Sequence, residues 1–261
     1  MCSVIFMIVH STKLSVACFL LLGVALIFAS GGSEAIDPEW SYDTGDNVYD
    51  VAISADGEYI AAGSTGYDNK LYLFDKDSST PLWSYQAGNI VCSVAISADG
   101  EYVVAGSWDK KIYLFDKDSD IPLWHYTTNG ALYSVAISAD GEYIAAGNHD
   151  DEFYLFDKDS SIPLWTYSAG DAVYSVSISA DGEYIAVGSF DGKVYLFDKD
   201  SSTPLWSYSL GGEVWSVSIS ADGEYIAAGG NGDKVYLFDK DSSTPIWNYD
   251  TGEDLLSVEI S

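Results

Sequence analysis

A unit of about 41 residues is repeated along most of the chain. Tryptophans recur at steps of 43 and then 41 residues, at Trp40, Trp83, Trp124, Trp165, Trp206 and Trp247. Asp-Gly pairs recur at the same steps, and each of the six prolines stands two residues before one of these tryptophans. A fixed period of this length indicates an array of one supersecondary unit. We therefore expect no second domain between Pro38 and the last tryptophan.

Each unit contains four short segments of β type. Within Val173 to Tyr208 these segments are VYSVSIS, EYIAVGS, KVYLFD and PLWSY, which alternate or are rich in β-branched and aromatic residues. The turn residues Ala180-Asp181-Gly182 and Phe190-Asp191-Gly192 separate the first three segments, and a polar stretch ending at Pro204 precedes the fourth. Four antiparallel strands in such a period are typical of one blade of a β-propeller. We therefore expect an all-β chain.

The number of blades follows from counting these segments. Five complete four-stranded units run from about Val48 to Tyr249, with one outer strand before them, Pro38 to Tyr42, and one inner strand after them, Leu255 to Ser261. A ring closed as six blades would leave unpaired inner edges in the last blade, which sheets usually avoid. We expect five complete blades plus parts of a sixth, in a truncated ring of a longer protein with six to eight blades; closure as six blades is the alternative.

The first 35 residues differ from the rest in charge. Residues 1–33 hold one lysine and no acid, whereas all 40 acidic residues follow. Lys13, an uncharged run from Leu14 to Ala29 and small residues up to Ser33 follow the order of a secretory signal. Residues 1–35 are predicted to be a signal peptide or an uncleaved membrane anchor, and residues 36–261 to be the propeller repeats. The body is then secreted or otherwise extracytoplasmic.

Charge limits the partners. Lysine and arginine together number 11 against 40 acids, for a formal net charge of −29. The sequence contains no arginine, which would supply the bidentate fork for phosphates and base edges. Such a surface repels polyanions. Nucleic acid and bare anionic membrane are excluded as partners, so membrane contact is expected only through an uncleaved N-terminal segment.

The segment SVSISADGEYIAVGSFDGKVYLFD resembles the WD-repeat pattern. Ser-Ala-Asp-Gly stands where that family usually has Ser-Pro-Asp-Gly, and Phe197-Asp198 where it has Trp-Asp; the resemblance covers Pro38 to the end. The Gly-His of the family before the first strand is missing, so its buried His-Ser-Asp-Trp network is not expected here. The resemblance implies a WD-type propeller.

A second resemblance concerns the later part of each unit. Asp198 and Trp206, with seven residues between them, have the spacing of the tryptophan-docking motif in quinoprotein (PQQ-type) dehydrogenase propellers, although Ser202 and Thr203 replace its Gly-Lys. That motif is structural and does not itself indicate a quinone site. Because the spacing of Asp198 and Trp206 is shared with these enzymes, a fragment of a quinoprotein-like oxidoreductase is kept as the alternative function.

Comparison of the repeats with each other indicates a binding face. The turns Ala-Asp-Gly-Glu-Tyr and Asp-Lys-Asp-Ser hardly change, whereas the loops between second and third strands differ every time. In the WD-type arrangement these loops share one end of the ring with the connections between blades. An aromatic-lined, acid-rimmed face for a peptide, a sugar or a cationic group is predicted from Tyr67, Trp108, His149, Phe190, Asn231, Tyr49, Tyr133, Tyr174 and Trp215. Drift in unconstrained loops is the alternative.

Calcium is the one metal that the sequence suggests. Alternate oxygen ligands occur at Asp75, Asp77 and Ser79, at Asp116, Asp118 and Asp120, and again in the later blades. The loop glycine and the distal glutamate that complete such sites are missing. An ordinary turn, in which Asp and Ser bond the backbone, is the competing interpretation, and no other cofactor is expected.

No catalytic constellation is apparent. Cys92 replaces a tyrosine of the other blades, which favours a packed small residue over a nucleophile, and the three histidines form no triad pattern with it. We therefore expect a protein that is not an enzyme. The expected role is an extracytoplasmic binding or scaffolding module whose variable face contacts a protein, peptide or glycan.

Overall fold

The computed structural model describes residues 4–6 and 38–260. Most of this part of the chain forms five four-stranded antiparallel sheets, which confirms the predicted all-β blades. The first to fifth blades contain, in chain order, β2 (Val48–Ile53), β3 (Tyr59–Ser64), β4 (Lys70–Asp75), β5 (Trp83–Gln86); β6 (Val91–Ile96), β7 (Tyr102–Ser107), β8 (Lys111–Asp116), β9 (Trp124–Thr127); β10 (Leu132–Ile137), β11 (Tyr143–Asn148), β12 (Glu152–Asp157), β13 (Trp165–Ser168); β14 (Val173–Ile178), β15 (Tyr184–Ser189), β16 (Lys193–Asp198), β17 (Trp206–Ser209); β18 (Val214–Ile219), β19 (Tyr225–Gly230), β20 (Lys234–Asp239), β21 (Trp247–Asp250).

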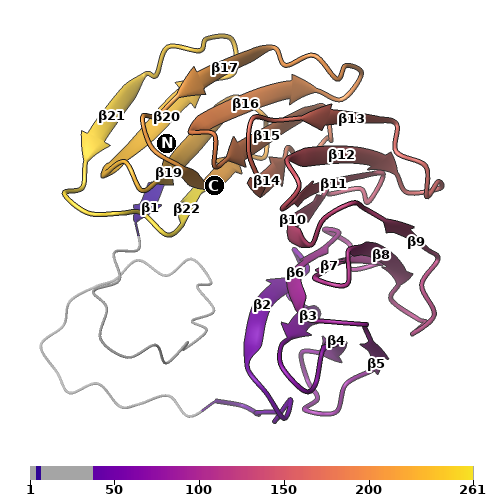
Figure 1. Cartoon of the computed structure of the whole chain (residues 1–261). Helices are drawn as coiled ribbons and strands as arrows, with labels where there is room; N and C mark the ends of the chain where they lie inside the picture. The colour runs from indigo at the N-terminus through magenta and orange to yellow at the C-terminus, as the bar shows by residue number, and fades with distance from the viewer. Residues whose placement is uncertain (1–3, 7–37, 261) are drawn as a thin grey trace, which may run out of the picture.

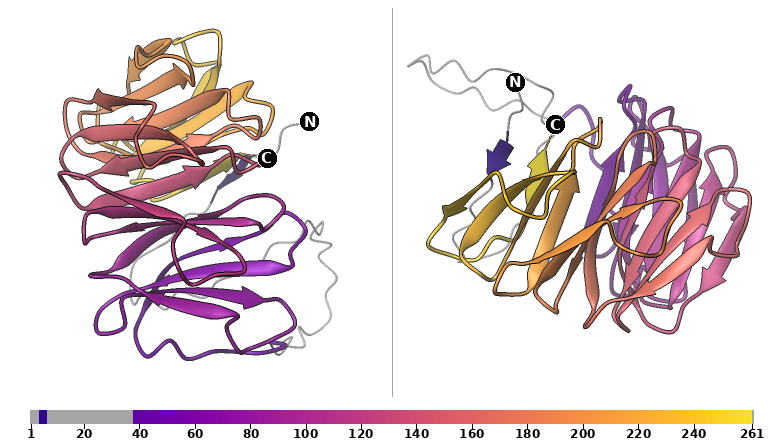
Figure 2. Two further views of the ribbon diagram at one scale, coloured as in Figure 1. Left: turned by 90° about the vertical axis from the view of Figure 1, so that its right-hand side faces the viewer. Right: turned by 90° about the horizontal axis from the view of Figure 1, so that it is seen from above.

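The blades stand side by side around a common axis. Figure 1 shows β2, β6, β10 and β14 nearest the middle and β5, β9, β13, β17 and β21 at the rim. In the fifth blade β18 is the corresponding first strand of the sheet. The arc is open between the first and the fifth blade, and the two further views in Figure 2 show the blades stacked face to face along it. A two-stranded sheet, β1 (Val4–Phe6) with β22 (Val258–Ile260), lies beside the fifth blade.

The hydrophobic core lies between neighbouring blades. Between the third and fourth blades, Phe153 and Leu155 pack against Val173, Ile185 and Phe197, all fully buried. A blade that lies between two others has both faces of its sheet covered. Its strands therefore present apolar side chains to the blade on each side. Each blade therefore depends on the next one for its core.

The repeated tryptophan fastens one blade to the following blade. The indole of Trp165 on β13 donates a hydrogen bond to the backbone oxygen of Lys199 at 2.6 Å. Its ring lies 5.5 Å from that of Phe197, and the ring of Tyr167 lies 4.9 Å from Phe197 in an edge contact. The same indole bond occurs at Trp40, Trp83, Trp124 and Trp206. The period of 41 residues thus reflects contacts between blades.

The Ser-Ala-Asp-Gly turns are closed by side chains. In the fourth blade the Ser179 hydroxyl donates to Asp181 at 2.7 Å and accepts the backbone N–H of Tyr184 at 3.0 Å. Gly182 has φ +73°, which favours glycine. An added Cβ there would also lie 2.5 Å from the ring of Tyr143 in the preceding blade. The invariance of this turn is therefore a requirement of the fold.

The two flanks of the arc carry the expected parts of a further blade. Trp40 and Tyr42 pack on Phe74 of the first blade with ring centroids 5.5 and 5.2 Å apart, as the outer strand of a preceding blade would. Residues 38–42 form no strand, however, because none of the described strands lies beside them to supply a hydrogen-bonded edge. At the other flank β22 occupies the place of an inner strand beside β18.

The predicted N-terminal signal or anchor lies outside the described residues except for β1. Within residues 4–6 and 38–260, no helix is both long and apolar enough to cross a membrane.

Candidate functional site

The variable loops do share one end of the arc with the connections between blades. The backbone N–H of Trp108, after β7, donates to Ile90 O at 2.9 Å, and that of His149 donates to Ala131 O at 2.9 Å. Phe190 makes the equivalent bond to Ala172 O. Each second-to-third-strand loop therefore lies directly against the chain that enters its own blade.

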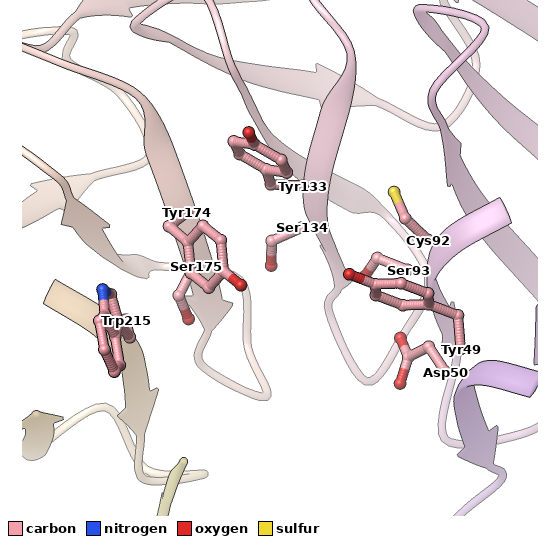
Figure 3. A pocket seen from close by; sticks show the side chains of 9 residues that line it. All are labelled: Tyr49, Asp50, Cys92, Ser93, Tyr133, Ser134, Tyr174, Ser175 and Trp215. Carbon is pink, nitrogen blue, oxygen red and sulfur yellow. The ribbon is translucent and has the colours of Figure 1, made fainter. Parts of the chain in front are cut away.

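At this end a hollow of about 220 Å³ opens among the inner strands (Figure 3). Figure 3 shows Tyr133, Tyr174 and Trp215 on one side and Tyr49 with Asp50 on the other. All five inner strands contribute to its wall. The lining residues are Tyr49, Asp50, Cys92, Ser93, Tyr133, Ser134, Tyr174, Ser175 and Trp215.

Most of the predicted aromatic residues meet at the mouth of this hollow. Tyr174 stacks on Phe190 with ring centroids 4.8 Å apart, and Tyr133 lies 5.1 Å from Tyr174. His149 extends the group, 5.8 Å from Tyr133. A separate contact joins Tyr49 of the first blade to Trp108 of the second at 6.4 Å. These rings come from neighbouring blades, so the mouth is an aromatic surface built across blade boundaries.

Two of the predicted residues lie away from the hollow. Tyr67 is 102% exposed, and its backbone N–H is held by the Asp46 carboxylate at 3.0 Å. Asn231 is exposed in the loop after β19, and neither residue lines the hollow. Trp215 does line it, and its indole donates to the carboxylate of Glu213 at 2.9 Å.

A ladder of hydroxyl groups joins the inner strands below the mouth. The Oγ of Ser93 accepts the N–H of Val135 in the next blade at 3.1 Å, and Ser134 does the same for Val176. Ser175 and Ser216 continue the series with the N–H groups of Val217 and Val258. A serine of each of these four blades therefore pairs with the backbone of the following inner strand, and in the fourth and fifth blades Ser177 and Ser218 add a second such bond, to Ile219 and Ile260.

In the first blade an aspartate takes the place of this serine. The Oδ2 of Asp50 accepts the N–H of Val94 at 2.8 Å, and its Oδ1 accepts the N–H of Val51 at 2.9 Å. Burial raises the pKa of Asp50 above its usual value, against the opposing effect of these N–H groups. Sequence reasoning missed this residue, although alignment of the repeats with each other sets Asp50 against four serines.

Asp50 gives the stability a pH dependence of known sign. Because its pKa is higher in the folded than in the unfolded chain, the folded chain binds more protons between the two values. The contribution of Asp50 to the free energy of unfolding is therefore greatest below about pH 4, which is its pKa in the unfolded chain. This contribution declines as the pH rises through the pKa of Asp50 in the folded chain. Asp50→Ser should gain in unfolding free energy relative to the wild type as the pH is raised from 4 to 7, measured by urea denaturation.

Asp222→Asn serves as the control of opposite sign. The Ser220 hydroxyl and the Glu224 N–H lower the pKa of Asp222, so its contribution is present above the unfolded pKa and is lost as the pH falls. The unfolding free energy of Asp222→Asn should be lower than that of the wild type at neutral pH, and this difference should become smaller as the pH is lowered. Parallel pH profiles for the wild type and Asp50→Ser would contradict the assignment at Asp50.

A hydrogen-bond network of side chains holds the base of two of the variable loops. Tyr113 donates its hydroxyl to Asp109, whose other oxygen accepts the N–H of Lys111 at 3.0 Å, and Ser107 accepts the N–H of Asp109 at 3.1 Å. The fourth blade repeats this arrangement with Asp191 and Tyr195. The loop that carries Trp108 is therefore anchored at its base.

The suggested calcium residues are engaged in turns. The Oδ1 of Asp75 accepts the N–H of Asp77 at 2.8 Å, and Lys76 pairs with Asp77 at 2.7 Å. Asp116 and Asp118 make the same bond at 2.9 Å, and Asp120 follows in that turn. Across residues 4–6 and 38–260, no group of three or more His, Cys, Asp or Glu side chains is placed to hold a metal ion.

Cys92 is packed, as its repeat position predicts. The thiol is 4% exposed and donates to the backbone oxygen of Leu132 at 2.9 Å. Burial raises the pKa of Cys92 to about 12. A nucleophilic cysteine needs a lowered pKa, so this side chain contributes to packing rather than to a reactive centre.

Comparison with known families identifies the repeat. The family described as WD domain, G-beta repeat matches five times, over residues 38–75, 79–116, 122–157, 161–198 and 203–239. Since the matches cover most of the sequence, the chain belongs to this family. Each match spans the outer-strand segment preceding a blade and the first three strands of that blade.

Domains of this family generally mediate interactions between proteins and are typically not catalytic. A comparison with curated proteins gives no match. The resemblance to quinoprotein propellers stays a prediction.

Proposed function

We propose that this protein is a non-catalytic extracytoplasmic module that binds a protein or peptide through the loop end of its blades. The observation that carries the proposal is the convergence of Tyr133, Tyr174 and Phe190 from adjacent blades on one hollow. Large rings at the surface of a folded domain are the side chains that contribute most to binding free energy. A glycan is the other ligand class that such rings suit.

The opposite end of the blades offers a contrast. Its Ser-Ala-Asp-Gly and Asp-Lys-Asp turns are closed by their own hydrogen bonds and are the same in every blade. At the loop end the side chains differ from blade to blade, on a backbone that the loop anchors fix. This combination of a rigid support and variable side chains is what a specific binding surface requires.

The test replaces two rings at the loop end. Trp108→Ala with Phe190→Ala should weaken binding of peptides selected on the wild type from a displayed random library by about 2 kcal/mol, or about 30-fold. Trp108 is 36% exposed and Phe190 lies in the mouth, so the melting temperature should change little. Binding is measured by calorimetry and stability by thermal denaturation.

The control is a double variant at the other end. Ile121→Ala with Ile162→Ala removes two apolar side chains that are 72% and 74% exposed, in the turns before β9 and β13. This variant should bind the selected peptides as the wild type does. Equal losses of peptide affinity in the two double variants, or no loss in the loop-end variant, would refute the proposal. A separate test incubates the wild type with calcium and pyrroloquinoline quinone; absorbance of the quinone that stays with the purified protein would also refute it.

A further inference from the structure

The hollow at the loop end contains one carboxylate among aromatic rings. Of the nine described residues that line it, Asp50 is the one acid, and none is basic. The ion pairs formed between described residues do not include Asp50. Its negative charge therefore faces the hollow without a cation from the described part of the chain.

The carboxylate is fixed in position. Its two oxygens accept the N–H groups of Val94 and Val51, and both donors belong to inner strands. In each of the other four blades a serine hydroxyl accepts the corresponding N–H of the following inner strand. Aspartate is therefore not needed for the ladder, and what it adds at this place is a charge.

Aromatic rings form the rest of the wall. Tyr133, Tyr174 and Trp215 line the side opposite Asp50, and Tyr49 lies beside it (Figure 3). The faces of such rings attract cations, most strongly where water is displaced. The volume of about 220 Å³ is smaller than that of sites for whole drug-sized ligands, so it suits one functional group.

We propose that this hollow binds an ammonium group, with its positive charge against Asp50 and its alkyl groups against the tyrosine and tryptophan rings. The group would be the end of a lysine side chain, methylated or not, in the peptide partner, so this inference rests on the proposed function. The net charge of −29 adds a long-range attraction for cations.

The experiment uses matched small probes. Choline and 3,3-dimethyl-1-butanol have the same shape, but only choline is charged, and n-butylammonium represents an unmethylated lysine. At pH 7.5 and physiological salt, calorimetric titration should give affinities for choline or n-butylammonium at least tenfold above that for the neutral alcohol. The preferred cation tells which form of lysine the hollow takes.

Two variants separate the site from the overall charge. Asp50→Ser restores the residue of the other blades and should weaken cation binding at least tenfold while leaving the fold intact, as checked by its melting curve. Asp77→Asn removes one charge from a 74% exposed side chain at the other end of the blades and should bind cations as the wild type does. If Asp50→Ser does not fold, Tyr174→Ala replaces it, with the same loss expected.

The results distinguish this inference from the proposal on which it rests. Equal affinities for choline and its neutral isostere, or undiminished cation binding by Asp50→Ser, would overturn the ammonium site. Equal weakening by Asp77→Asn would also overturn it, because the effect would then be one of net charge. Peptide binding that is lost in the Trp108 and Phe190 double variant would still support the loop end as the binding surface in either case.

Discussion

Phe197→Ala should lower the free energy of unfolding by about 4 kcal/mol, the cost of deleting a large buried aromatic side chain. The Phe197 ring is fully buried at the boundary between the third and fourth blades. It contacts Phe153, Trp165 and Tyr167 with centroid distances of 5.5, 5.5 and 4.9 Å. The rigid strands on both sides limit collapse around the cavity. Urea denaturation followed by tryptophan fluorescence measures the change.

The exposed ring of Tyr67 provides the control for this prediction. Tyr67→Ala removes an aromatic side chain of similar size that is wholly in solvent, and its unfolding free energy should stay within about 0.5 kcal/mol of the wild type. A loss below about 1 kcal/mol in Phe197→Ala would show that the blade boundary is not closely packed.

Gly147→Ala should destabilise the protein by about 3 kcal/mol, at the upper end of the usual cost of overfilling a core. A Cβ on Gly147 would lie 2.4 Å from Cγ1 of Val173 and 2.9 Å from its backbone oxygen, both on the inner strand of the next blade. Because a backbone atom is involved, a side-chain rotation cannot relieve the contact. Each blade has a glycine at this position, at Gly63, Gly106, Gly147, Gly188 and Gly229.

Gly232→Ala is the matched control for that substitution. The nearest atom to an added Cβ there is 3.6 Å away, which is ordinary van der Waals contact. Its unfolding free energy should change by less than about 1 kcal/mol. Similar losses in both variants would mean that the effect at Gly147 comes from backbone entropy rather than from the contact with Val173.

The blades could be predicted from the sequence because each local signal agrees with the repeat. The alternating segments, the Asp-Gly turns and the spaced tryptophans all indicate the same four strands. The segment Pro38 to Tyr42 is the exception, since its pattern is that of a strand but strand formation needs a hydrogen-bonding neighbour. Packing of Trp40 on Phe74 does not need such a neighbour, and the structure shows this contact.

The site could be predicted only in part. Aromatic residues in polar loops pointed to Phe190 and His149, and the structure brings both to Tyr133. Tyr67 gave the same signal, yet its loop points its ring into solvent. Nothing in the loop composition separates these cases, because ring direction depends on backbone geometry at the blade boundary. Asp50 carried a signal in the repeat comparison, as a charge in a series of hydroxyl groups.

The indole bonds between blades give the arc a direction. In each of them the indole N–H of a tryptophan donates to the backbone oxygen of a lysine in the following blade. An inner blade of the row therefore accepts one such bond from the blade before it and donates one to the blade after it. Such an array behaves as a row of coupled units whose stability is the sum of the units and of their shared boundaries. Unfolding of the third blade alone breaks the packing at two blade boundaries, whereas unfolding that starts at either end of the row breaks one boundary at a time. The loop-end hollow, which draws on all five inner strands, is therefore intact only while the whole row is.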